Sequence, residues 1–237
     1  MEEPERMKRF YEHAEAVRTD LGWHVALDGR PVKTQGGRPQ IVPISDLGEM
    51  LAGEWEGQGE DIDPSQFFAR DMADYAIDIV DRDRDAAIER LLRYAETDTL
   101  CYRADPDEPL WKRQQEVWEP LVSAFEAREG VSVERVSGVI HRPPKAETRE
   151  RLRERLETLH PFRLAALETL TALSASLCVG LSALESDADG DVLWNAANLE
   201  EDWQAQLWGT DEEAAARRAK RKREFLAALE FARAAVS

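Results

Sequence analysis

The period of the hydrophobic residues constrains the fold of this chain most strongly, because it changes near Pro64 and then stays helical to the end. Beyond that residue, apolar side chains recur at helical spacing over roughly 65–81, 84–97, 107–129, 145–159, 161–185, 189–208 and 211–235. Short connections separate these segments, and each presents an apolar stripe that needs a partner. The pattern therefore predicts an orthogonal bundle of helices.

The segment before Pro64 has a different pattern. In "GWHVALDGRPVKTQGGRPQIVP", the apolar Trp23, Val25 and Leu27 alternate with other residues, as in a half-buried strand. "DGR" at 28–30 and "QGG" at 35–37 have the composition of tight turns, so residues 22–42 predict a small antiparallel meander. Residues 4–18 predict a short helix before it. We expect an α+β fold, with a small N-terminal α/β domain at 1–65 and a helical bundle domain at 66–237.

Two further segments bear on the architecture. "GVSVERVSGVIHRPP" at 130–144 has β character and could pair with the N-terminal meander. "TLTALSASLCVGLSAL" at 169–184 is the most apolar stretch, but it is shorter than the ~20 residues that span a bilayer. It predicts a buried central helix.

The charge of the chain argues against anionic partners. With 31 Lys and Arg against 48 Asp and Glu, the net charge is −17, which repels nucleic acid and anionic membranes from most of the surface. The basic run "RRAKRKRE" at 217–224 is the exception. Glu213 stands four residues before Arg217 and other acidic residues precede it, so a charged C-terminal helix explains the run better than a nucleic-acid patch.

Cys101, in "AETDTLCYRADPDEP", is the most suggestive candidate nucleophile, with Asp98 and Arg103 nearby. A reactive thiol needs a base, and no histidine is paired with Cys101 by spacing. The histidines are His13, His24, His141 and His160. Free cysteine is usually buried, so packing in the core is the favoured interpretation. A thiol-dependent enzyme that uses Cys101 remains the alternative.

Signals for cofactors and metals are absent from the sequence. Neither G-x-x-x-x-G-K-[ST] nor G-x-G-x-x-G occurs, so no nucleotide-binding loop is predicted. Cys101 and Cys178 form no C-x-x-C motif, and scattered histidines make no recognisable metal set. Carboxylate pairs such as Asp74 and Asp78 are typical of solvated faces in so acidic a chain. We predict no cofactor, no metal and no catalytic residue.

The segment "VLWNAANLEEDWQAQLWG" at 192–209 predicts a surface for a protein partner. One helical stripe, predicted to face the core, consists of Val192, Ala196, Leu199, Trp203 and Leu207. Glu200 falls at the edge of that stripe, and Glu201, Gln204 and Trp208 fall on the other side. Trp is enriched at interface hot spots, so these four polar and aromatic residues are the candidate partner-binding site. The alternative is that Trp208 folds back onto the next helix.

Five motifs in order carry a resemblance to a known family. They are "GWHVALDGRPVKT", "LAGEWEGQ", "TDTLCYRA", "QQEVWEPL" and "LEEDWQAQLWGTDEEA". Together they resemble the assembly chaperones that act on the α subunit of F-type ATP synthase, the ATP-twelve family, from about residue 9 to residue 230. The resemblance implies the layout expected above, a small α/β domain followed by a helical bundle.

The same resemblance implies the function. A chaperone of this kind is expected to hold the unassembled α subunit and prevent its aggregation until the β subunit replaces it. It is not an enzyme, and free it is expected to be a monomer. "MEEPERMKRFYEHAEAV" at the start lacks an apolar export signal and an Arg-rich presequence. We therefore expect a bacterial cytoplasmic protein, or a mitochondrial matrix protein if the chain is a trimmed mature form.

Overall fold

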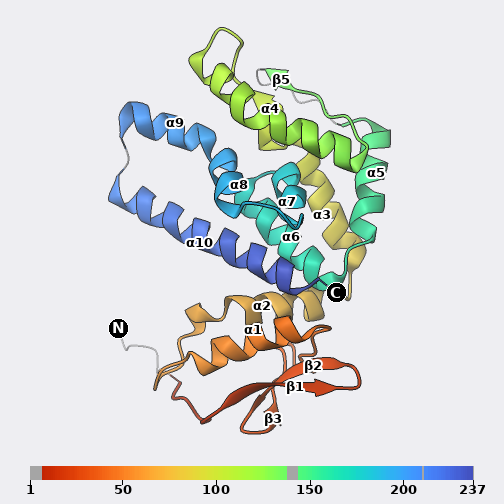
Figure 1. Ribbon diagram of the computed structural model, residues 1–237, viewed down its shortest axis with the longest axis vertical. Coiled ribbons are helices and arrows are strands. Elements are labelled where there is room, and N and C mark those ends of the chain that lie inside the picture. Colours follow the sequence, from red (N-terminus) through yellow and green to blue (C-terminus); the bar gives the residue numbers. More distant parts are fainter. Residues whose placement is uncertain (1–6, 138–143, 210, 237) are drawn as a thin grey trace. The chain divides into compact units, whose positions relative to one another are not determined.

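The computed structural model describes residues 7–137, 144–209 and 211–236 (Figure 1). The chain forms two compact units. Unit 1 contains Met1–Arg84, Pro161–Ala165 and Glu230–Ser237, and unit 2 contains Asp85–His160 and Ala166–Leu229. A small antiparallel sheet near the N-terminus is followed by helices, which confirms the α+β class. The division into independent domains at residue 65 stays a prediction.

Unit 1 is built on the predicted meander. Strands β1 (Ala14–Thr19), β2 (Gly22–Leu27) and β3 (Arg30–Pro31) form one antiparallel sheet in that order. Between β2 and β3, Asp28 and Gly29 have φ angles of 48° and 76°, which the tight hairpin turn requires. The second predicted turn is also present, with the Gly37 amide donating to the Thr34 carbonyl at 2.9 Å.

The predicted helix at 4–18 is wrong within the described residues. Residues 7–13 contain no helix, and Ala14–Thr19 is strand β1, which pairs along its whole length with β2. The small side chain of Ala16 lies close to Gly48 in the helix that covers the sheet, so β1 has a tertiary role that local helix spacing does not reveal. Strand pairing overrides the local preference here.

Helices α1 (Ser45–Glu56) and α2 (Phe68–Tyr75) complete the main body of unit 1. A short 3-10 helix (Pro64–Gln66) precedes α2, and a π-helical segment (Ala76–Val80) continues it. The Glu54 carboxylate accepts hydrogen bonds from the amides of Ala69 and Arg70, and so caps the first turn of α2. Leu51 and Trp55 stand at helical spacing, which predicts that Trp55 faces the core, and the structure confirms it: Trp55 is 7% exposed and packs against Phe67.

The remaining elements lie mainly in unit 2. They are α3 (Arg84–Glu96), a 3-10 helix (Thr99–Cys101), β4 (Tyr102–Arg103), α4 (Pro109–Glu129), β5 (Val136–Ser137), α5 (Ala146–Glu157), α6 (Pro161–Ser174), α7 (Leu177–Ala183), α8 (Gly190–Ala197), α9 (Leu199–Trp208) and α10 (Glu212–Ala234). Within the described ranges, no helix is long and apolar enough to cross a membrane.

Two predicted helices are each divided into two. The segment 161–185 is buried as expected, but it breaks at Ala175, whose φ is 51°, and α7 begins after the capping residue Ser176. The segment 189–208 breaks at Asn198, between α8 and α9. Both breaks occur at or next to residues whose side chains compete with the backbone for hydrogen bonds.

Within the described residues, the β segment at 130–144 pairs with β4 and not with the meander. Val136 and Ser137 form β5, which pairs in parallel with Tyr102 and Arg103 of β4 inside unit 2. The part of this segment at 138–143 lies outside the described residues.

Candidate functional site

Helix α9, in unit 2, is buried at its first residue and exposed at its last. Leu199 is the only residue of α9 that is buried, whereas Leu207 and Trp208 at the other end are 59% and 78% exposed. Large apolar side chains with that exposure are available to a partner protein. The free end of α9 is therefore the candidate contact surface.

Helix α8 holds the fixed end of α9 in place. Leu193, Trp194 and Ala196 of α8 are buried, and the Trp118 indole N–H on α4 donates to the Ala196 carbonyl at 2.7 Å. Trp118 and Leu121 stand at helical spacing, which predicts that Trp118 faces the core, and Trp118 is fully buried. The chain thus enters α9 from a rigid point in the core.

The predicted apolar stripe through 192–207 is confirmed at Ala196 and Leu199, which are buried, and is wrong at Val192 and Leu207. The Asn198 side chain donates to the Trp194 carbonyl, and the break there stops α8 and α9 from acting as one continuous helix. As a result Val192 is 54% exposed and Leu207 is exposed too, instead of facing the core. The asparagine in "NAANLE" was the sequence signal for this break, since asparagine favours helix ends over helix interiors.

The four predicted site residues divide into two groups. Glu201, Gln204 and Trp208 are exposed on α9, as expected, and Trp208 does not fold into the core. Glu200 is exposed as well, but its carboxylate accepts a hydrogen bond of 2.7 Å from the Gln114 side-chain amide on α4. Partial burial of the carboxylate raises the pKa of Glu200, and the Gln114 hydrogen bond opposes that rise only in part. Glu200 therefore fastens α9 to α4 as well as lying beside the exposed surface.

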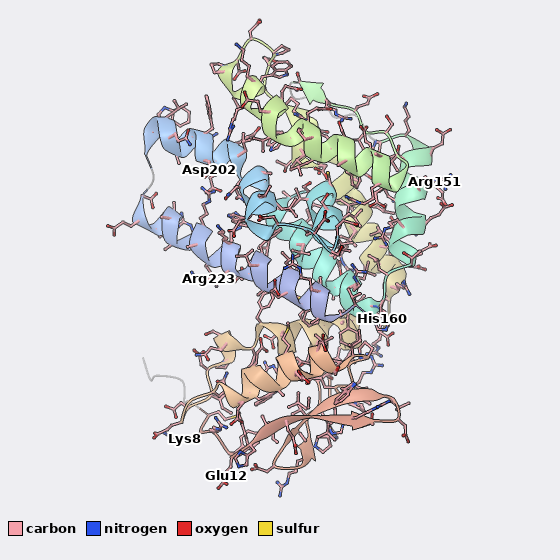
Figure 2. All side chains as sticks on the ribbon, in the orientation of Figure 1. Lys8, Glu12, Arg151, His160, Asp202 and Arg223 are labelled. Atoms are coloured by element: carbon pink, nitrogen blue, oxygen red, sulfur yellow. The ribbon has the colours of Figure 1, made fainter. Side chains whose placement is uncertain are left out.

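Ion pairs join the neighbouring helices of this region. Asp202 on α9 lies on the side toward α10 and pairs with Arg218 (Figures 1 and 2). Lys222 pairs with Asp191 of α8 at 2.5 Å, and Arg217 pairs with Glu213 on its own helix. Basic residues of the 217–224 run therefore pair with carboxylates of the same chain, as expected for a charged C-terminal helix.

A hollow of about 480 Å³ borders α9 on the side of α4 and α8. Val117, Val192 and Leu199 supply apolar lining, and Trp203 and Gln206 line it from α9. Sequence reasoning missed Val192 as a surface residue, because it placed Val192 in the predicted core stripe, and it did not single out Val117. The hollow and the exposed end of α9 together make an amphipathic surface.

Cys101 has the properties of a core residue. Its side chain is 8% exposed, and burial, together with the nearby Asp98 carboxylate, raises the pKa of the thiol well above its usual range. The Asp98 carboxylate accepts hydrogen bonds from Ser176 and from the amides of Leu100 and Cys178, so it caps two helices. A thiol that stays protonated is a poor nucleophile, which argues against thiol catalysis here. His141 lies outside the described residues.

Among the described residues, no group of three or more His, Cys, Asp or Glu side chains is arranged to hold a metal ion. The Asp74 and Asp78 pair has a structural role instead of forming a solvated face. Asp74 accepts from the Gln35 amide at 2.9 Å, and Asp78 accepts from the Gly36 amide at 2.9 Å. Both carboxylates hold the 34–37 turn.

Comparison with known proteins decides the family. The sequence model described as "ATP12 chaperone protein" matches residues 8–126, which is half of the chain. The chain belongs to the ATP12 chaperone family. The structure of Atp12 from Paracoccus denitrificans has a TM-score of 0.92 and 33% sequence identity, covering 97% of this chain and 99% of that one. The D202K mutant of P. denitrificans Atp12p aligns with a TM-score of 0.91.

Further relatives agree with that assignment. A putative chaperone from Agrobacterium tumefaciens has a TM-score of 0.91 and 34% identity, covering 96% of this chain and 85% of that one. The mitochondrial protein atp12 of Schizosaccharomyces pombe is 28% identical over 202 residues, which are 80% of this chain and 69% of that protein. As an ATP12 family member, the chain is a chaperone for ATP synthase assembly and not an enzyme.

Proposed function

We propose that this ATP12 chaperone binds the unassembled α subunit of the F-type ATP synthase and prevents its aggregation until the β subunit replaces the chaperone. The proposed contact surface is the free end of α9 with the turn at Gly209. Glu201, Gln204 and Trp208 contact the client, and Glu200 sets the position of the helix. We further propose that the free chaperone is a monomer, in the bacterial cytoplasm or the mitochondrial matrix.

The observation that carries this proposal is the exposure of Leu207 and Trp208 on a helix whose other end is fixed in the core. Exposed apolar surface costs free energy in water, and a client that covers it recovers that cost. Gln204 and Glu201 lie about one and about two turns before Trp208, where polar groups favour a defined register over indiscriminate apolar binding.

The amphipathic character of the α9 surface also suits release of the client. An isolated α subunit that exposes an apolar face aggregates unless a partner covers that face. A surface with one large aromatic anchor and polar neighbours protects the face, yet a β subunit with a larger interface can displace it by mass action.

An aggregation assay of the isolated α subunit tests the proposal. We expect Trp208→Ala and Glu201→Lys each to weaken protection and to leave the melting temperature unchanged, because both side chains are exposed. Matched controls are Leu21→Ala, which removes a side chain that is 79% exposed in unit 1, and Glu150→Lys, which reverses an exposed charge on α5. Both controls should protect like the parent.

Two results would count against the proposal. If Trp208→Ala, Glu201→Lys and their double variant all melt and protect like the parent, α9 is not the client surface. If the parent chaperone protects an unrelated aggregating protein as well as it protects the α subunit, the client assignment is wrong.

A further inference from the structure

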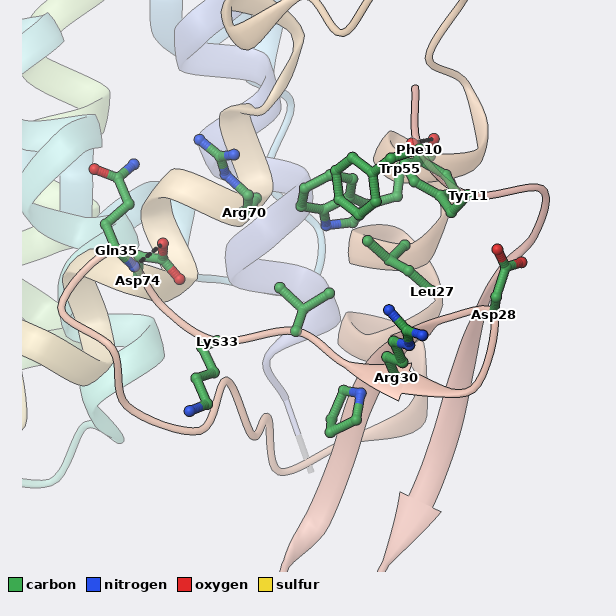
Figure 3. A pocket seen from close by; sticks show the side chains of 12 residues that line it. Phe10, Tyr11, Leu27, Asp28, Arg30, Lys33, Gln35, Trp55, Arg70 and Asp74 are labelled. Atoms are coloured by element: carbon green, nitrogen blue, oxygen red, sulfur yellow. Dashed lines mark hydrogen bonds between the residues drawn. The ribbon is translucent and has the colours of Figure 1, made fainter. Parts of the chain in front are cut away.

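Unit 1 contains a cavity of about 480 Å³ whose residues have no part in the surface on α9 (Figure 3). Its lining comes from the segment before β1, from the end of β2 through β3 and the following residues, and from α1 and α2. A volume of this size is within the range of pockets that bind ligands or side chains of partner proteins.

Aromatic side chains form one wall of the cavity. Phe10 is 65% exposed, and its ring meets that of Tyr11 edge to face, with centroids 5.4 Å apart. Tyr11 in turn meets Trp55 at 5.7 Å, and the Tyr11 hydroxyl donates to the Trp55 carbonyl. These contacts fix the wall before any occupant arrives, so binding need not order it.

Trp55 also carries an unused hydrogen-bond donor. Its indole N–H is buried and has no acceptor among the described residues. Figure 3 shows this nitrogen on the side of the ring that faces the segment carrying Arg30 and Lys33. A buried donor without an acceptor costs free energy, which an acceptor group brought into the pocket would recover.

The mouth of the cavity is basic, in a chain of net charge −17. Arg30 and Lys33 are exposed there, and neither forms an ion pair with a carboxylate within the described part of the chain. Arg70, the third basic residue of the lining, lies over the ring of Phe67, 4.1 Å from its centroid, and is already paired with Asp71 at 2.6 Å.

The two carboxylates in the lining are already used by the chain. Asp28 accepts from the amides of Glu12 and His13, the latter at 2.9 Å. Asp74 accepts from the Gln35 amide and, at 2.6 Å, from the Gln40 side-chain amide. Asp28 remains ionised and attracts Arg30, but neither Arg30 nor Lys33 is held in an ion pair among the described residues, so both can reach a carboxylate from outside.

We propose that this cavity binds an acidic peptide segment of the protein client, with one apolar side chain inside the pocket and flanking carboxylates at its mouth. The apolar side chain packs against Phe10 and Trp55, and the carboxylates pair with Arg30 and Lys33. Charge complementarity favours an acidic peptide as the occupant, because most of the surface of so acidic a chain repels acidic peptides. The inference rests on the proposed chaperone function for the source of the peptide, but it uses none of the residues on α9.

Short synthetic peptides test the site on the full chain. The probe is acetyl-Glu-Phe-Glu-amide. Its binding is measured by calorimetry and by the shift of the Trp55 indole N–H resonance in NMR spectra. The Trp55→Phe variant assigns that resonance, because the signal is missing from its spectrum. We expect binding that shifts this resonance and weakens as salt is added. Acetyl-Glu-Ala-Glu-amide and acetyl-Lys-Phe-Lys-amide should each bind about tenfold or more weakly, since one lacks the apolar anchor and the other reverses the charge.

Substitutions of the two basic residues at the cavity mouth provide a second test of the inference. The double variant Arg30→Glu, Lys33→Glu should bind the acidic peptide about tenfold or more weakly and should gain affinity for the basic one. Arg18→Glu is the matched control, because Arg18 is exposed on β1 and does not line the cavity. A Trp55 resonance unmoved by millimolar acidic peptide would overturn the inference, as would equal binding by the double variant. A shift caused by ATP and not by peptide would assign the cavity to nucleotides and overturn it too.

The outcomes separate this inference from the proposed function. If Trp208→Ala loses protection of the α subunit and the peptides do not bind, only the cavity inference fails. If the acidic peptide binds as expected and the α subunit is not protected, the client assignment fails while the pocket stands as a site for acidic peptides.

Discussion

Replacement of Trp118 is the sharpest test of how the core positions the proposed client surface. The Trp118 side chain is fully buried on α4, and its indole N–H donates to the Ala196 carbonyl of α8 at 2.7 Å. The guanidinium of Arg103 lies 5.3 Å from the ring centroid. One side chain therefore links α4 to the helix that leads into α9.

The expected loss of stability follows from these contacts. Trp→Ala in a core costs about 3–5 kcal/mol, and a buried carbonyl left without its donor adds about 1 kcal/mol or more. We expect Trp118→Ala to lose about 4–6 kcal/mol, which lowers the melting temperature by about 8–24 °C in a chain of this length. Trp118→Phe keeps most of the ring and loses the donor, so its loss should be about 1–3 kcal/mol.

Thermal unfolding followed by near-UV circular dichroism measures these differences. Trp208→Ala is the matched control: it removes the same side chain from a position that is 78% exposed, and it should melt within about 2 °C of the parent. A parent-like melting curve for Trp118→Ala would refute the reasoning. So would a Trp118→Phe variant as unstable as Trp118→Ala, since the hydrogen bond would then not be separable from packing.

Three further predictions follow from the chemistry of single groups. Cys101→Ser should be less stable by about 1–3 kcal/mol, because a buried hydroxyl needs a partner, yet it should protect the α subunit at temperatures where it is folded; loss of protection in a variant as stable as the parent would contradict the core role. The purified chain should bind no ATP, since it has no phosphate-binding loop, and micromolar binding in a calorimeter would show otherwise. Burial raises the pKa of Glu200, so its contribution to stability is full below the ordinary glutamate pKa and falls as pH rises through the raised value. Glu200→Gln keeps an acceptor for Gln114 without the charge, so its melting temperature relative to the parent should be higher at pH 7 than at pH 4; a difference that does not change with pH would refute this account.

Much of the fold could be predicted from local pattern alone. The hairpin turn at Asp28 and Gly29, the helical segments beyond Pro64 and the buried positions of Trp55 and Trp118 all follow from residue type and spacing. Strand β1 did not, because Ala14–Thr19 becomes a strand only through its pairing with β2. The partner of β5 was wrong for the same reason, since pairing between distant segments leaves no local period.

The candidate site was less predictable than the fold. The exposure of Trp208 and Glu201 followed from the helical wheel, but the wheel assumed one helix through Asn198. A single break there changed which face of the chain Val192 and Leu207 occupy. The cavity beside Trp55 left no sequence signal, because its lining gathers residues from four separate elements.

A chaperone that must release its client gains from two modest contacts on one chain. The two proposed contacts are an aromatic anchor on α9 and a basic pocket in unit 1, and each can be weak when it acts alone. Once one is bound, the other binds at a high effective concentration, so the pair holds the client more tightly than either. A β subunit that displaces one contact returns the other to its weak intrinsic affinity. The opposite charges of the two surfaces, acidic at Glu201 and basic at Arg30 and Lys33, also require different partner segments, so a client must offer both to be held.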